Sequence, residues 1–443
     1  MKAGEQNNRM NIRPVKKSKK KRAVFFFLVA LISLPALIHA WWPSEARMAS
    51  RRYSYTSIPQ AYSFINYSKN ELQFPGGHEK WDELFARFER LIFDGDGKIN
   101  ILHIGGSHVQ GGALTDKLRS NFAELTYGVE GERGFVFPYQ LAGTNAPKSM
   151  KCTYTGKWQG QRSSVSSHSA RWGMSGIAAT TNDSVASFQL SLLKSDSLAY
   201  PFNKVRVYFS ATSNMQVELV SSVKVLEEKV DTLAGFKEWI FSPSMDQLDV
   251  SIHRTDSLPG SFTLQGVYLG DNNNGITYNT IGVNGAGTYS YLKCPDFKNQ
   301  IATLKTDVVV FAIGVNDANC PKSDFDRLAF EARYDSLITQ FKAANPKTCF
   351  LFITNNDTYY DRRYPNPNGP QVQLAMMNLA QRHQGAVFDF FEIMGGLGAI
   401  DYWVDANLAA KDRIHFTKTG YEYEADLMYA AFQKSFGDYL ARR

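Results

Sequence analysis

Apolar runs that alternate with amphipathic stretches occur in two parts of the chain, at 79–125 and after about residue 275. Short apolar runs bounded by turn residues, which are typical of buried strands, occur at 99–104, 278–283, 307–313, 348–354 and 386–390. Apolar residues at helical spacing occur at 79–93, 113–125, 289–304, 324–344, 369–383 and 418–439. Strands alternating with helices predict an α/β fold, a flavodoxin-like parallel sheet with helices on both faces.

A different pattern separates these two parts. Short runs in which apolar and polar residues alternate recur about every ten residues, separated by Ser, Asn, Gly and Pro. They lie at 205–209, 215–219, 248–252 and 262–269. The pattern predicts an all-β sandwich module at 150–274, inserted into an α/β domain that comprises 79–149 and 275–443.

The N-terminal residues show no globular pattern. Residues 1–22 carry nine basic side chains and one acidic one, and an 18-residue apolar segment follows at 23–40. The basic flank predicts a cytoplasmic tail at 1–22. The segment is either a signal peptide cut after Ala40 or a transmembrane anchor spanning 23–42, with Trp41 and Trp42 at the membrane interface.

Both interpretations place the remaining chain outside the cytoplasm, either anchored to the inner membrane or secreted to the periplasm. Residues 43–78 are polar and lack a clear period, so they are expected to form a spacer.

Charge and cysteine content narrow the function classes. The total net charge is +7, and residues 1–22 contribute +8, so the rest of the chain carries −1. A near-neutral body gives no electrostatic basis for binding nucleic acid. The four cysteines lack CxxC spacing, so no zinc site is expected; one or two disulfides remain open.

Chemically active residues gather where predicted elements end. Gly105-Gly106-Ser107-His108 ends the first buried run, and Gly282–Gly287 contains Gly285. Gly314-Val315-Asn316-Asp317 follows the run at 307–313, and Asp412-Arg413-Ile414-His415 precedes the last helix. Parallel strands end at one edge of a sheet, so these segments are expected to meet there. They would supply a nucleophile, a base, a residue that orients the base, and oxyanion donors.

These four segments resemble the blocks of the SGNH (GDSL-type) hydrolase family. Its third block, Gly-x-Asn-Asp, and its last, Asp-x-x-His, are both matched in full by this chain. The first block differs, because Gly106 stands where the family usually has an aspartate that helps to order the turn. The resemblance covers both parts of the α/β domain but not the β module.

The resemblance implies a role for each matched residue. Ser107 would attack an ester carbonyl, His415 would accept its proton, and Asp412 would orient the imidazole. The backbone N–H groups of Ser107 and Gly285 and the side-chain amide of Asn316 would form the oxyanion hole. No metal or organic cofactor is called for.

Three further features stay open at this stage. His108 flanks the nucleophile, where it either contacts substrate or supports the catalytic residues from behind. Residues 131–139 are expected to form a loop, either structural or at the edge of the pocket. The inserted module's aromatic residues belong either to its core or to a sugar-stacking surface; they are Trp158, Trp172, Tyr208 and Trp239.

The first block, the inserted module and the export signal together are similar to peptidoglycan and polysaccharide O-acetylesterases. We therefore expect an exported serine esterase that removes O-acetyl groups from a cell-envelope glycan. One alternative is an O-acetyltransferase that receives its acyl group from a membrane-bound acyltransferase partner, since only the final acceptor differs. Another is an inactive relative that binds glycan.

Overall fold

A six-stranded sheet organises the α/β part of the protein, in a computed structural model that describes residues 58, 61–125, 131–193 and 200–443. The strand order is β1 (Leu72–Gln73), β19 (Ala386–Phe388), β16 (Cys349–Ile353), β15 (Val308–Ala312), β2 (Lys98–Gly105) and β14 (Gly275–Gly282). Strand β1 is antiparallel to β19, and the other neighbouring strands pair in parallel. The five parallel strands therefore have the flavodoxin-like order 2-1-3-4-5, as expected from the sequence.

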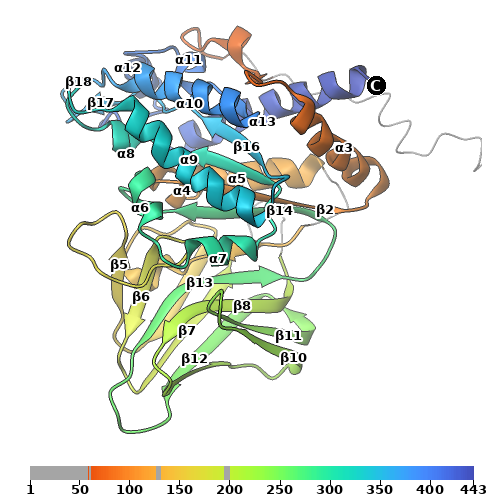
Figure 1. The fold of residues 1–443 in the computed structure, drawn as a ribbon, viewed down its shortest axis with the longest axis vertical. Coiled ribbons are helices and arrows are strands. Elements are labelled where there is room, and N and C mark those ends of the chain that lie inside the picture. The colour runs from red at the N-terminus through yellow and green to blue at the C-terminus, as the bar shows by residue number, and fades with distance from the viewer. Residues whose placement is uncertain (1–57, 59–60, 126–130, 194–199) are drawn as a thin grey trace, which may run out of the picture. The chain divides into compact units, whose positions relative to one another are not determined.

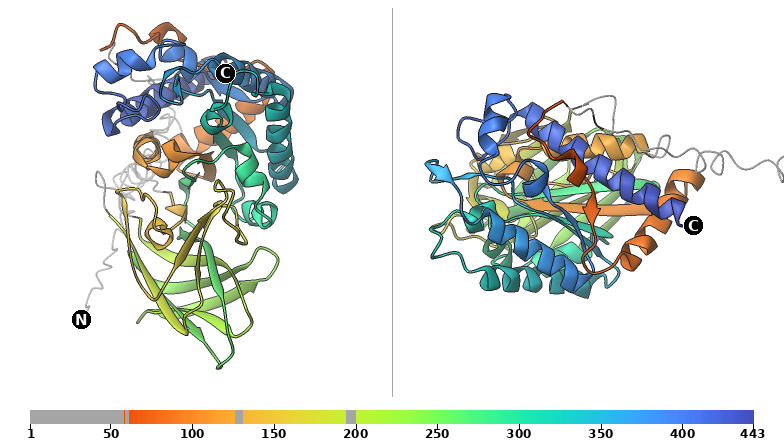
Figure 2. Two further views of the ribbon diagram at one scale, coloured as in Figure 1. Left: turned by 90° about the vertical axis from the view of Figure 1, so that its left-hand side faces the viewer. Right: turned by 90° about the horizontal axis from the view of Figure 1, so that it is seen from above.

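Alternate residues of each central strand enter different cores. In β15, Val308 and Val310 join one core cluster, while Val309 and Phe311 join the other. The first cluster contains α3 (Glu79–Asp94), α5 (Ala113–Leu125) and α13 (Lys418–Ala441). The second contains α6 (Thr288–Leu292), α7 (Phe297–Ala302), α9 (Arg327–Ala344) and α10 (Gly369–His383). Helices therefore cover both faces of the sheet (Figures 1 and 2).

Short elements fill the connections between these helices and strands. They are η1 (Tyr67–Lys69), α4 (Ser107–Gln110), η2 (Tyr139–Ala142), α8 (Val315–Ala318), the β17–β18 hairpin (Tyr359–Tyr360 and Tyr364–Pro365), α11 (Phe390–Ile393) and α12 (Ile400–Asp405). Both α4 and α8 begin within three residues of the end of a central strand. They therefore place their side chains at the carboxyl edge of the sheet.

The inserted module consists of two antiparallel sheets (Figure 1). The larger sheet contains β3 (Gly134–Val136), β5 (Gln159–Arg162), β6 (Ile177–Thr181), β8 (Phe202–Ala211), β10 (Lys224–Asp231), β11 (Phe236–Met245) and β13 (Phe262–Gly270). The smaller contains β4 (Met150–Thr155), β7 (Val185–Leu192), β9 (Met215–Leu219) and β12 (Gln247–Arg254). Trp172, Tyr208 and Trp239 are buried in its core, and the half-buried Trp158 packs against that core. Three of these four aromatics are thus unavailable for stacking on a sugar.

Three local expectations from the sequence are wrong. The helix expected at 289–304 is two helices, α6 and α7, because Pro295 lacks an N–H and disfavours helical backbone at Cys294. Residues 134–136 of the expected loop form strand β3, which pairs with β13. In the described part of the expected spacer, β1 pairs with β19, and Ile65 and Leu72 are buried.

The apolar segment at 23–40 lies outside the described residues, so its expected role as signal or anchor remains a prediction. In the part of the chain that the structure describes, no helix has the length and apolar character needed to cross a bilayer. The four cysteines, all within the described ranges, are free thiols.

Candidate active site

Ser107 lies directly beyond the carboxyl end of β2, at the first position of α4. Hydrogen bonds to neighbouring segments fix the turn that contains Ser107. The Tyr291 hydroxyl donates to the Gly105 carbonyl at 2.6 Å, and the Gln110 side chain accepts from the Asn284 N–H at 2.6 Å. These bonds tie α4 to the segments that follow β14, so the serine has a fixed position without the aspartate of the usual first block.

His415 and Asp412 lie on the loop between α12 and α13, and the loop brings His415 to the serine. The Ser107 Oγ is 2.9 Å from His415 Nε2, and His415 Nδ1 is 2.8 Å from Asp412 Oδ2. Asp412 Oδ1 also accepts the backbone N–H groups of Ile414 and His415, each at 3.0 Å. Arg413 takes a left-handed conformation (φ 57°), which turns the chain tightly enough for both bonds.

The charge on Asp412 is stabilised by these donors. Burial alone would raise the pKa of Asp412, but the hydrogen bonds from the His415 and Ile414 backbones and the His415 ring outweigh it and lower the pKa. Asp412 is therefore ionised at neutral pH. An ionised carboxylate at Nδ1 holds the proton on that nitrogen and leaves Nε2 free to accept the serine proton.

The segments that contain Gly285 and Asn316 meet beside the serine. The Asn316 amide donates to the Ala286 carbonyl at 3.0 Å, which fixes the orientation of that side chain. A Cβ atom added at Gly106 would lie 3.2 Å from Asn316 Nδ2, so this amide lies against the residue that precedes Ser107. Gly285 has a positive φ of 78° in the turn closed by the Ala286 N–H and the Val283 carbonyl. A glycine suits this position because it adopts such a conformation without strain.

Asp317 anchors its segment rather than facing the serine. Its buried carboxylate accepts the backbone N–H and the hydroxyl of Thr288, at the start of α6. The bond links the loop after β15 to the loop after β14, the two loops that carry Asn316 and Gly285.

His108 is part of this cluster, with its two ring nitrogens in different surroundings. Its ring stacks on the His415 ring with centroids 5.1 Å apart, and its Nδ1 is 3.1 Å from the Tyr421 hydroxyl. Its Nε2 is buried without a hydrogen-bond partner among the described residues. Burial and the neighbouring His415 lower the pKa of His108 to about 3, so the ring is neutral. The geometry favours a supporting role over direct contact with substrate.

Glu424 is a buried acid near the site that sequence reasoning missed. It lines, together with His108, Gly106 and Asn316, a small cavity of about 30 Å³. Burial raises the pKa of Glu424 to about 8, and its Oε2 has no partner among the described residues. The signal was weak, because a glutamate on an amphipathic helix usually faces solvent.

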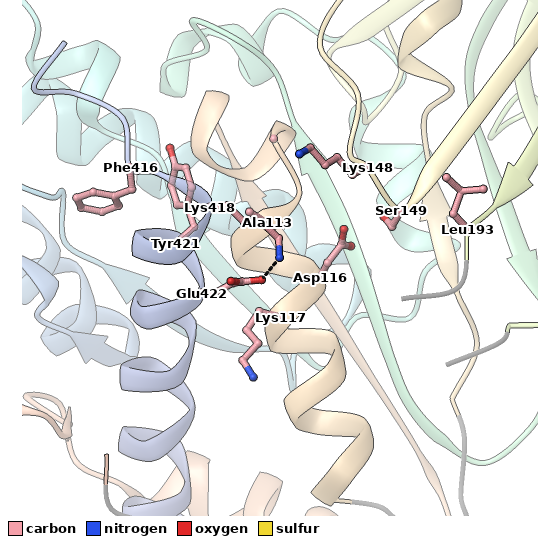
Figure 3. Close-up of a pocket in the computed structure, with 11 residues that line it drawn as sticks. Ala113, Asp116, Lys117, Lys148, Ser149, Leu193, Phe416, Lys418, Tyr421 and Glu422 are labelled. Carbon is pink, nitrogen blue, oxygen red and sulfur yellow. Dashed lines mark ion pairs between the residues drawn. The ribbon is translucent and has the colours of Figure 1, made fainter. Parts of the chain in front are cut away.

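A larger pocket of about 350 Å³ opens beside Phe416, the residue that follows His415 in the chain (Figure 3). It is lined by the first turns of α5 and α13, by Phe416, by Lys148 and Ser149 just before β4, and by Leu193 just after β7. No group of three or more His, Cys, Asp or Glu side chains in the described ranges could hold a metal ion.

The arrangement has the parts that acyl transfer requires. A serine hydroxyl contacts an imidazole, the imidazole contacts an ionised carboxylate, and an amide donor lies next to the serine. All of these groups lie at the carboxyl edge of the sheet, beside the switch point between β2 and β15, where α/β proteins bind ligands.

Comparison with known proteins indicates the class of enzyme. Residues 257–423 match the GDSL-like Lipase/Acylhydrolase family; this stretch contains Gly285, Asn316, Asp412 and His415, and Ser107 lies outside it. The inserted module accounts for that gap, because it separates the first block from the other three. Among curated proteins, none is similar in sequence to this chain.

Solved structures share the fold. The chain is similar to a structure described as "Peptidoglycan O-acetylesterase in action", with 21% identity and a TM-score of 0.63, over 82% of this chain and 99% of that one. A crystal structure of the acetyl xylan esterase AlAXEase matches 35% of this chain and 81% of its own, with 21% identity and a TM-score of 0.28. The lipase/acylhydrolase from Enterococcus faecalis matches 37% and 78%, with 22% identity and a TM-score of 0.28.

The first of these similarities spans both the α/β part and the inserted module, and it establishes a shared fold. Residues 257–423 thus form part of a GDSL-like lipase/acylhydrolase domain, and the chain has the SGNH hydrolase fold with an antiparallel β module inserted after α5. The chain belongs to the class of serine hydrolases that act on ester bonds.

Proposed function

We propose that this protein is an exported esterase that removes O-acetyl groups from a cell-envelope glycan, with Ser107, His415 and Asp412 as its catalytic triad. The observation that carries the proposal is the continuous contact from the Ser107 Oγ through the His415 ring to Asp412, at 2.9 and 2.8 Å. The shared fold with a peptidoglycan O-acetylesterase supports the choice of an acetylated glycan as substrate.

The reaction proceeds in two acyl transfers. His415 Nε2 accepts the proton of Ser107 as its oxygen attacks the acetyl carbonyl, and the resulting imidazolium protonates the departing sugar oxygen. Water, deprotonated by His415, then attacks the acetyl-serine and releases acetate. Asp412 stabilises the imidazolium in both steps.

Negative charge develops on the carbonyl oxygen in each transfer. Three donors are available to it: the Ser107 N–H, the Gly285 N–H and the Asn316 amide. The Asn316 amide is already oriented by the Ala286 carbonyl, and none of the described residues accepts its second N–H, which can bind the oxyanion. Donors that need no reorganisation contribute most to the rate.

The basic residues at 1–22 and the apolar segment at 23–40 support the location. A basic flank before an apolar segment directs the chain that follows out of the cytoplasm, whether the segment is cleaved or retained as an anchor. We therefore place the hydrolase in the cell envelope, where its glycan substrate would be found.

Labelling with a fluorophosphonate probe tests the triad directly. The wild-type protein should be labelled on Ser107, and Ser107→Ala should not be labelled. His415→Ala should slow labelling greatly, whereas Asp412→Asn should slow it less, because the imidazole remains in place. Equal labelling of all variants would contradict the triad, and an unlabelled wild-type protein would indicate a glycan-binding relative without activity.

The fate of the acetyl group separates hydrolysis from transfer. We expect free acetate from an O-acetylated glycan incubated with the wild-type protein and none with Ser107→Ala. If a membrane-bound partner instead supplies acetyl groups, labelled acetyl would appear on an unacetylated glycan in membranes that contain both proteins.

A further inference from the structure

The pocket of about 350 Å³ beside Phe416 takes no part in the chemistry described above (Figure 3). Its volume lies in the range of sites that bind small molecules. Two features define what it could hold, namely its position relative to Ser107 and the charges on its walls.

The pocket adjoins the reacting atoms. Gly111, on its wall, donates its N–H to the Ser107 carbonyl at 3.0 Å, and Phe416 directly follows His415 in sequence. A group bound in the pocket would therefore lie next to an ester held at Ser107. It would belong to the same substrate molecule, as part of the glycan rather than of the two-carbon acetyl group.

Most of the charged side chains on the pocket walls form ion pairs with other side chains of this protein. Asp116 pairs with Arg119 at 2.6 Å, and Glu422 pairs with Lys418 at 2.8 Å. Lys117 lies 3.5 Å from Asp426.

Lys148 differs from these residues, because its ammonium has no ion pair among the described residues. Its side chain is exposed and extends toward the start of α5 (Figure 3). The pocket thus presents one uncompensated positive charge, next to the positive end of a 13-residue helix.

The remaining wall is apolar. Leu193 is 47% exposed, and Phe416 and Tyr421 line the pocket although only 5% and 9% of their surfaces are exposed. Apolar and aromatic surfaces pack against the C–H faces of a sugar ring, while a lysine binds an anionic substituent as a point charge. A neutral apolar ligand would leave the Lys148 charge without a partner.

We propose that this pocket is a subsite for a sugar unit that carries a carboxylate, with Lys148 as the residue that recognises the charge. The inference rests on the proposed function, because it assumes that the ester at Ser107 belongs to a glycan. It adds that the substrate is an acidic polysaccharide rather than a neutral one.

Binding measured without catalysis tests the subsite alone. Calorimetric titration of Ser107→Ala with a galacturonate oligosaccharide should show binding that weakens about tenfold when Lys148→Glu is added, because attraction is replaced by repulsion. Salt at about 1 M should remove most of the difference, since it screens charges beyond about 3 Å. A neutral xylan oligosaccharide should bind less tightly and should not respond to the substitution.

The matched control is Lys347→Glu, an equal charge reversal at an exposed lysine just before β16, at the opposite end of the sheet. It should leave galacturonate binding unchanged. An equal loss of galacturonate affinity in both variants would show that the effect comes from net charge alone, and this would overturn the proposal. Equal affinity for the acidic and the neutral oligosaccharide would also overturn it.

Kinetics separate this proposal from the proposed function. For the active enzyme, the ratio of kcat/KM on acetylated galacturonan to that on acetylated xylan should fall about tenfold in Lys148→Glu. An unchanged ratio would overturn the subsite while leaving the esterase in place. If no acetylated glycan is hydrolysed but galacturonate binding still depends on Lys148, the proposed function fails and the subsite remains.

Discussion

Gly106 determines how closely the Asn316 amide approaches Ser107. A Cβ atom at this position would lie 3.2 Å from Asn316 Nδ2, closer than most such contacts, so a side chain here would push the amide away. Instead, hydrogen bonds of the Tyr291 hydroxyl and the Gln110 side chain hold the turn that contains Ser107. The departure from the usual first block is therefore compatible with an ordered site.

Removing the Asn316 amide should lower turnover with little effect on substrate binding. We expect Asn316→Ala to reduce kcat about 10²–10³-fold on p-nitrophenyl acetate, with KM nearly unchanged, because the amide acts on charge that appears only in the transition state. The control is Asn299→Ala, which removes a side-chain amide on α7 whose bond is to the Leu233 carbonyl. A loss of less than threefold in kcat for Asn316→Ala would remove this residue from the oxyanion hole.

Glu424 should make the stability of the protein depend on pH. Its pKa of about 8 in the folded protein lies above the ordinary value of 4.5, so the folded state holds an extra proton between these values. The stability is full below about pH 4.5 and falls as the pH rises through 8, by a few kcal/mol. Glu424→Gln should abolish this fall.

Urea unfolding at pH 5 and pH 9 measures the effect. The wild-type protein should lose stability between these values, whereas Glu424→Gln should be more stable than the wild type at pH 9 and close to it at pH 5. Glu227→Gln, at an exposed carboxyl on β10, should behave as the wild type. The same pH slope in Glu424→Gln as in the wild type would show that this carboxyl does not titrate on unfolding.

At the level of elements, the regular pattern of the chain predicted most of the α/β part. Helix α10 occupies the predicted 369–383, and α5 the predicted 113–125. These segments were predictable because their apolar residues face a single core. The short segments at the strand ends also meet as expected, since parallel strands end at a common edge.

Elements stabilised by distant partners could not be predicted in this way. Residues 131–136 begin with Gly-Glu-Arg-Gly, which is typical of an exposed loop, but Glu132 is buried because the Lys98 ammonium and the Tyr268 hydroxyl compensate its charge. Those partners are remote in sequence, so no local pattern indicates that the segment is buried. His108 is similar, because nothing in its neighbourhood along the chain shows that Tyr421 and His415 enclose it.

At the level of the whole molecule, the α/β part and the inserted module share a core. Tyr208 of the module contacts Thr303 at 2.6 Å, and Gln300 of α7 is fully buried between the two. Gln300 accepts the Met174 N–H at 2.8 Å and donates to the Gln265 side chain at 2.6 Å. We expect a single cooperative thermal transition, because neither part can unfold without exposing this core.

Gln300→Ala should lower the midpoint of that transition by a few degrees, since it leaves two buried polar groups unpaired at a cost of about 1–3 kcal/mol each. Differential scanning calorimetry measures both the midpoint and the number of transitions. Asn299→Ala, which removes a neighbouring hydrogen bond at the surface, should change the midpoint little. Two separate transitions in the wild type would show that the halves unfold independently.

The position of β2 in the sheet has a consequence for biosynthesis. Both of its neighbours, β14 and β15, come after the inserted module, so the strand that ends at the nucleophile has no partner until the ribosome has passed residue 275. A nascent chain would keep this strand exposed through the synthesis of the entire module, and exposed apolar strands tend to aggregate. Activity would then arise only after nearly the whole polypeptide is made, and a chaperone that shields the waiting strand should raise the yield of folded enzyme.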